Sequence, residues 1–261
     1  MKLQKSVCID ALYTELPFIE RFAAAQADGF DYIEFWGHDD KDIDAIERLV
    51  NEKHIKISGF NGDADLNLID PNQQKEYLEY LKKSLSIAQR IGSKSVTIHS
   101  NGLGDGGIVL NSYRELSTTL KTAAMYDTLL QCAQLAEQTG ININLEPLNI
   151  ISDHIGNFLN YTSDAADLTR LIGSDKLKIL YDVYHMQLNE GNIAGNIDAN
   201  VDQFGHIHIA DTPGRHEPGT GEINYAFVFD YLENAGYTGL IGYELFPLTD
   251  TKTAVEAIMS Y

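Results

Sequence analysis

The chain has 261 residues, of which 44% are hydrophobic, so it can bury a sizeable core. Its 38 acidic and 19 basic residues give a net charge of −19, which argues against nucleic acid as a partner because affinity for phosphate backbones comes largely from lysine and arginine. Cys8 and Cys132 lie in apolar surroundings and do not suggest a disulfide scaffold. No signal peptide or membrane span is apparent, so we expect a cytoplasmic protein that handles small molecules or divalent cations.

Short apolar runs alternate with longer segments of helical period along the whole chain. The expected strands are 5–12, 30–37, 55–61, 94–100, 141–147, 176–185, 204–211 and 240–247. The expected helices are 16–29, 42–53, 71–92, 112–140, 162–173, 192–203, 224–236 and 254–261. Eight strand–helix units in roughly 250 residues predict a (β/α)₈ TIM barrel. A doubly wound open sheet is the alternative, but the regular repeat indicates no topological switch point. Because no linker divides the chain, we expect a single domain over 1–261.

Four successive expected strands each bring one oxygen or nitrogen donor to the same rim of such a barrel. These donors are Glu146, Asp182, His208 and Glu244. Catalytic residues of (β/α)₈ barrels lie at this rim, where the strands end. Three carboxylates and one imidazole favour Mg²⁺ or Mn²⁺, with Co²⁺ or Zn²⁺ as further options. We therefore predict metal-assisted proton transfer next to a carbonyl, with two carboxylates acting as base and acid.

Further polar side chains are expected at the same rim and could contact a substrate. His185 follows the sixth strand and could donate to a substrate oxygen, while Arg215 could hold a carboxylate or an oxyanion. His99 and Glu34 end their strands on this rim, and each could contact substrate or support the residues that do. We expect His206 to face the helix layer or to make a buried hydrogen bond, and we interpret it as structural.

The run GLGDGG at 102–107 superficially suggests a phosphate-binding loop. It lacks the G-x-x-x-x-G-K-[ST] pattern, and no G-x-G-x-x-G follows the first strand. We therefore expect no nucleotide cofactor.

Four stretches carry a resemblance to a known family: LEPLN at 145–149, YDVYHMQLNEG at 181–191, HIHIADTPGRHEPGTGEINY at 206–225 and GYELFP at 242–247. They resemble the hydroxypyruvate isomerase family within the xylose isomerase-like barrels, and the resemblance spans nearly the whole chain. It implies a (β/α)₈ barrel that interconverts hydroxypyruvate and tartronate semialdehyde, or isomerises a related oxo acid. It also implies that Glu146 and Glu244 transfer the proton, and that they bind the metal together with Asp182 and His208.

The chain departs from the hydroxypyruvate isomerases at two places. His208 stands where those isomerases carry glutamine, whereas the related ketose 3-epimerases carry histidine there. Leu245-Phe246-Pro247 follows the last glutamate, where the isomerases tend to read Tyr-Lys-Pro. A ketose 3-epimerase is therefore the alternative enzyme, and the substrate stays open between an oxo acid and a neutral ketose.

Two other functions can be weighed against these residues. Part of the three-zinc ligand set of the endonuclease IV enzymes is matched by His99, Glu146, Asp182, His185, His208, His216 and Glu244. Their Asp-x-His pair, however, reads Gly214-Arg215-His216 here, and no histidine follows the third strand. A non-catalytic metal- or sugar-binding barrel is the remaining alternative. We expect a small-molecule substrate, no nucleic acid and no membrane, and homo-oligomerisation stays open.

Overall fold

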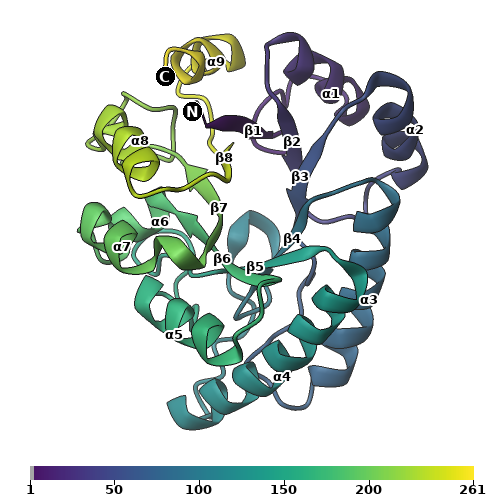
Figure 1. Cartoon of the computed structure of the whole chain (residues 1–261), viewed down its shortest axis with the longest axis vertical. Helices are drawn as coiled ribbons and strands as arrows, with labels where there is room; N and C mark the ends of the chain where they lie inside the picture. The colour runs from purple at the N-terminus through teal and green to yellow at the C-terminus, as the bar shows by residue number, and fades with distance from the viewer. Residues whose placement is uncertain (1–2) are drawn as a thin grey trace.

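The computed structural model describes residues 3–261, in which eight parallel strands form a barrel surrounded by helices (Figure 1). The strands are β1 Gln4–Cys8, β2 Tyr32–Phe35, β3 Ile57–Phe60, β4 Ser95–His99, β5 Asn142–Glu146, β6 Leu177–Asp182, β7 Phe204–Ile209 and β8 Leu240–Tyr243. They follow the order β3-β2-β1-β8-β7-β6-β5-β4. A parallel bridge between Asn61 and Thr97 spans the seam between β3 and β4. The predicted (β/α)₈ barrel is confirmed.

The helices lie outside the strands, and several of them begin at a side-chain cap. They are α1 Phe18–Ala27, α2 Ile43–Lys53, α3 Gln74–Arg90, α4 Thr118–Thr139, α5 Thr162–Ile172, α6 Val183–Asn189, α7 Ile193–Asn200, α8 Tyr225–Asn234 and α9 Thr251–Met259, with 3₁₀ turns η1 Asp105–Gly107 and η2 Val201–Gln203. Asp42 caps α2 by accepting from the Ala45 amide at 2.9 Å, and Ser117 caps α4. Gly140 ends α4 at a φ of 76°, a left-handed conformation that glycine adopts readily.

The core lies between the strands and the inward faces of the helices. In α3 the fully buried side chains Tyr77, Leu81, Leu85 and Ala88 recur every three or four positions, so one face of the helix packs on the sheet. Each large apolar side chain buried in this way contributes about 1.5–3 kcal/mol. Within residues 3–261, no helix combines the length and the apolar character needed to cross a membrane.

All eight strands end earlier than the sequence predicts, and the ends of the sixth and eighth shape the rim of the barrel at the predicted donors. The sixth was expected to run to His185, but it ends at Asp182, where α6 begins. Asp182 Oδ1 accepts from the backbone amides of Tyr184 and His185, at 2.8 and 3.2 Å, and this cap turns the chain into a helix. The eighth strand ends at Tyr243, so Glu244 lies just beyond it.

Candidate functional site

The four predicted donors lie together at the carboxyl ends of β5 to β8. Glu146 is the last residue of β5, Asp182 is the last residue of β6, and His208 lies near the end of β7. The register pairs Asp182 with His208 and His208 with Gly242, so adjacent strands present these groups at one level. Only 4% of Glu146, none of Asp182 and 7% of His208 is exposed. The site is therefore a buried group of ionisable side chains.

The donor atoms of Glu146, Asp182 and His208 lie within 4.8 Å of one another. Glu146 Oε1, Asp182 Oδ2 and both ring nitrogens of His208 are buried without a hydrogen-bond partner among residues 3–261. Buried polar atoms without partners cost free energy and call for an explanation, such as an ion or a ligand. Two carboxylate oxygens and one imidazole nitrogen at this spacing fit a divalent cation, and the excess of oxygen donors fits Mg²⁺ or Mn²⁺.

Glu244 lies beside this group but is held by other partners. Its Oε2 accepts from Arg215 Nη2 at 2.5 Å and lies 3.5 Å from His208 Nδ1. Its Oε1 accepts from the indole Nε1 of Trp36. Arg215 Nη2 is also 3.6 Å from Asp182 Oδ2, so the guanidinium lies between the carboxylates of the sixth and eighth units. Arg215 has a φ of 59°, and such left-handed backbone in a residue other than glycine is often found at functional sites.

The surroundings shift the pKa values of two carboxyl groups in opposite directions. Burial raises the pKa of Asp182 to about 7, although Arg215 and His208 oppose the shift. Burial also acts to raise the pKa of Glu244, but Arg215 and His208 outweigh it and hold that pKa well below its usual value. Oppositely shifted carboxyl groups are typical of sites that move protons.

His185 is fully buried, and two side-chain donors lie against its ring. The Asn149 side-chain oxygen accepts from the Ser152 amide at 3.0 Å, so the amide nitrogen of Asn149 donates to His185 Nδ1 at 2.7 Å. Arg215 Nη2 lies 3.3 Å from Nε2, which is also 3.5 Å from Asp182 Oδ2. Burial and the nearby Arg215 lower the pKa of His185 well below its usual value. His185 is thus a neutral imidazole beside Arg215 and Asp182.

His99 lies behind Glu146. Its Nε2 is 3.1 Å from Glu146 Oε2, and its Nδ1 is 3.2 Å from Asp63 Oδ2. Burial acts to lower the pKa of His99, but Asp63 and Glu146 outweigh it and raise that pKa to about 10. The structure therefore places His99 against Glu146 and Asp63.

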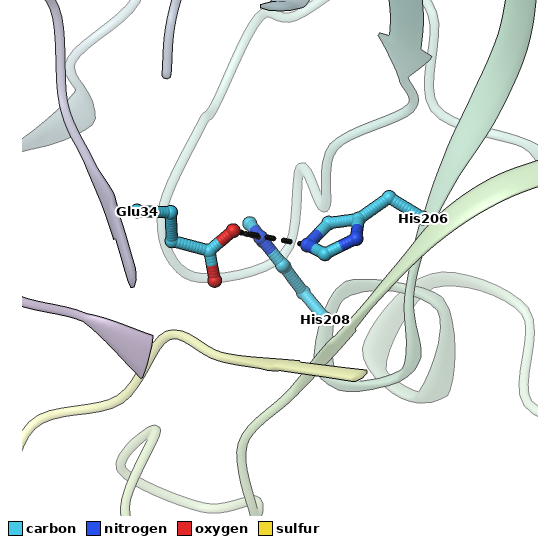
Figure 2. Close-up of side chains that lie close together, drawn as sticks. All are labelled: Glu34, His206 and His208. Carbon is cyan, nitrogen blue, oxygen red and sulfur yellow. Dashed lines mark hydrogen bonds and ion pairs between the residues drawn. The ribbon is translucent and has the colours of Figure 1, made fainter. Parts of the chain in front are cut away.

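Glu34 meets both histidines of β7 inside the barrel (Figure 2). Glu34 Oε2 accepts from His206 Nε2 at 2.9 Å and lies 3.4 Å from His208 Nε2. Because β8 and β1 separate β7 from β2, this contact crosses the barrel interior. Of the two places expected for His206, the buried hydrogen bond is the one observed, and the helix layer is not, since residues two apart in a strand point to the same face.

Three polar residues near the site were not singled out in the sequence. Asp63 and Asn149, described above, follow β3 and β5 and orient the two histidines. His154 lies with its ring 5.0 Å from that of His185, and its Nδ1 donates to the Gly107 carbonyl at 2.7 Å. A Cβ at Gly107 would come within 2.5 Å of the His154 ring. The glycine-rich run therefore packs against a buried histidine.

Comparison with known proteins identifies the family to which the chain belongs. The chain belongs to the xylose isomerase-like TIM barrel family, whose family model matches residues 22–261. It is 29% identical to the hydroxypyruvate isomerase of Escherichia coli, over 99% of each chain. It is 30% identical to the 2-oxo-tetronate isomerase of Haemophilus influenzae, over 96% of each chain. A crystal structure of an AP endonuclease, family 2, from Brucella melitensis superposes with a TM-score of 0.88 at 25% identity, covering 100% of this chain and 99% of that one. The resemblance to hydroxypyruvate isomerases is confirmed.

Proposed function

We propose that the protein is an isomerase of a small 2-oxo acid, with hydroxypyruvate and tartronate semialdehyde or a related pair as substrates. The observation that carries the proposal is the buried group of Glu146, Asp182 and His208, whose unpartnered donor atoms lie within 4.8 Å of one another beside Glu244 and Arg215. The names of the two isomerase relatives support an oxo acid as substrate. The net charge of −19 argues against nucleic acid.

Glu146, Asp182, His208 and Glu244 would hold a divalent cation, Mg²⁺ or Mn²⁺. When bound, the cation would polarise the substrate carbonyl and make the neighbouring carbon-bound proton easier to remove. For Glu244 to join the other three, its Oε2 would exchange the Arg215 contact for the cation. That exchange frees the guanidinium.

The freed Arg215 would bind the carboxylate of the oxo acid. A guanidinium matches a carboxylate in a two-pronged hydrogen bond, and burial strengthens the pair because water does not screen it. Once Arg215 has moved away from His185 Nε2, that nitrogen would carry the ring proton, because Asn149 donates to Nδ1, and it would donate a hydrogen bond to a substrate oxygen. Together these two side chains orient the substrate so that the carbons to be deprotonated and reprotonated face the glutamates.

Glu146 and Glu244 would carry the proton between the two carbons. One glutamate, ionised at the start, would remove a proton from C3 of hydroxypyruvate, and the other, protonated at the start, would deliver its proton to C2, while the hydroxyl proton on O3 moves to O2. The two glutamates exchange protonation states over the turnover. His99 holds Glu146 Oε2 and leaves Oε1 directed to the site.

The test incubates the purified protein and Mg²⁺ or Mn²⁺ with hydroxypyruvate, other short 2-oxo acids and simple ketoses. We expect turnover of an oxo acid that is abolished in Glu146→Gln and kept in Glu217→Gln. Glu217 is a suitable control because it is also buried, yet it binds the Leu248 amide and not the site. Metal binding without turnover of any oxo acid would contradict the proposal.

A ketose 3-epimerase is the second candidate, favoured by two residues. His208 replaces the glutamine of the isomerases that the sequence resembles. Phe246, 43% exposed, packs edge-on against Trp36 with ring centroids 6.4 Å apart, so an apolar surface stands where those isomerases tend to have a lysine. Deuterium incorporation at C3 of a ketose, without aldose formation, would favour this candidate over the oxo-acid isomerase.

A further inference from the structure

Glu34 approaches His208 from the side opposite to Glu244. We propose that Glu34 is a positioning residue, which accepts the Nε2 proton of His208 and thereby turns the unprotonated Nδ1 toward the divalent cation. This inference rests on the cation site of the proposed function. It adds to that site a carboxylate, Glu34, that does not itself bind the cation.

Each ring nitrogen of His208 faces a different carboxylate. Nε2 lies 3.4 Å from Glu34 Oε2, and Nδ1 lies 3.5 Å from Glu244 Oε2. Neither pair is a well-formed hydrogen bond, so the imidazole ring can reorient on cation binding without breaking one. A histidine that binds a metal through one nitrogen commonly donates its other N–H to a carboxylate, which fixes both tautomer and orientation. The cation belongs on the Nδ1 side, because Glu244 lies there.

Glu34 is itself held in place inside the barrel. Its Oε2 accepts from His206 Nε2 at 2.9 Å and from Ser58 Oγ at 3.3 Å, so it is directed toward the imidazoles (Figure 2).

Gly242 makes the space in which these side chains meet. It is paired with His208 in the register between β7 and β8. A Cβ at this position would lie 2.4 Å from Glu34 Oε1, 2.7 Å from His206 Nε2 and 2.7 Å from His208 Cδ2. Only glycine leaves this cluster undisturbed.

A competing assignment would place a second cation between Glu34, His206 and His208, whose donor atoms also lie within 4.8 Å of one another. Two observations favour the hydrogen-bonded role. His206 Nε2 is engaged in its bond to Glu34, and Glu34 Oε2 accepts from both Ser58 and His206. A second cation would have to break these contacts, and its presence is an outcome of the test.

The test measures Mn²⁺ affinity and stoichiometry by titration calorimetry and electron paramagnetic resonance for the unaltered protein, Glu34→Gln and Glu217→Gln. We expect one ion per chain throughout, with affinity lowered between about ten- and a hundredfold in Glu34→Gln alone. An unchanged affinity in Glu34→Gln, or loss of a second ion, would overturn the inference while leaving the proposed function standing. Absence of binding in the unaltered protein would overturn both.

A second measurement needs no variant and guards against Glu34→Gln failing to fold. Nitrogen-15 histidine spectra of the unaltered protein loaded with Zn²⁺ report which nitrogen of His208 carries the proton. We expect a proton on Nε2 and the metal on Nδ1. The reverse assignment would overturn the inference.

Discussion

His99 and Glu146 end neighbouring strands in register, and His99 Nε2 lies 3.1 Å from Glu146 Oε2. The other ring nitrogen of His99, Nδ1, contacts Asp63, which fixes the orientation of the ring. His99 thus engages Glu146 Oε2, while Glu146 Oε1 has no hydrogen-bond partner in the described part of the chain. This relationship gives Glu146 one oriented oxygen and one available oxygen, as a group that moves a proton needs.

The same relationship predicts how stability changes with pH in the metal-free protein. The folded-state pKa of His99 is raised to about 10, above its ordinary value near 6.5. The stabilisation is therefore complete below about pH 6.5 and is lost as the pH rises through 10. Urea unfolding should show a free energy of unfolding that falls from pH 7 to 10 more steeply than in His99→Gln. Parallel curves would contradict this account of His99.

Arg215→Lys should separate an acidic substrate from a neutral one. Lysine keeps the charge but loses the planar fork, so we expect catalytic efficiency toward an oxo acid to fall about ten- to a hundredfold, the equivalent of one charged hydrogen bond. Activity toward a neutral ketose should change less. Steady-state kinetics on both substrate types measure the difference, with Arg170→Lys as control because Arg170 pairs with Asp202 away from the site. Equal losses on both substrates would contradict carboxylate binding by Arg215.

Asp182 should show two separable roles. Asp182→Asn keeps an oxygen that can cap α6 and removes a buried charge, so we expect stability at least equal to that of the unaltered protein but loss of metal binding. Asp182→Ala also removes the cap and should be less stable than Asp182→Asn by about 1 kcal/mol. Thermal unfolding and Mn²⁺ titration measure the two effects. Equal melting temperatures for both variants would argue against the capping role.

Gly242→Ala should damage the metal site through the residues that surround it. The added methyl group would displace Glu34 and both histidines, with a cost of about 1–3 kcal/mol in stability and weaker metal binding. Gly92→Ala is the matched control, because Gly92 has a φ of 65° and no heavy atom within 4 Å of its ideal Cβ. The control should lose stability without losing Mn²⁺ affinity. If Gly242→Ala bound Mn²⁺ normally, the cluster would not support the site.

The sequence predicted the barrel and brought its candidate donors to one rim, because apolar runs locate the strands even though every expected strand runs past the observed end. Contacts across the barrel could not be predicted from one strand at a time. Glu34 on β2 contacts His206 on β7 across the barrel interior, so the sequence allowed a buried hydrogen bond for His206 but could not name Glu34 as its partner. The start of α6 was not predicted because Asp182 is both the last residue of β6 and the N-cap of α6.

The most direct test of the central claim follows hydroxypyruvate by proton NMR in D₂O with the Mg²⁺- or Mn²⁺-loaded protein. The account predicts deuterium at C3 of hydroxypyruvate and C2 of tartronate semialdehyde. Glu146→Gln should lose the interconversion, and with it the exchange at the carbon that Glu146 serves, despite retained substrate binding. Bound metal and bound substrate with no exchange in the unaltered protein would contradict it.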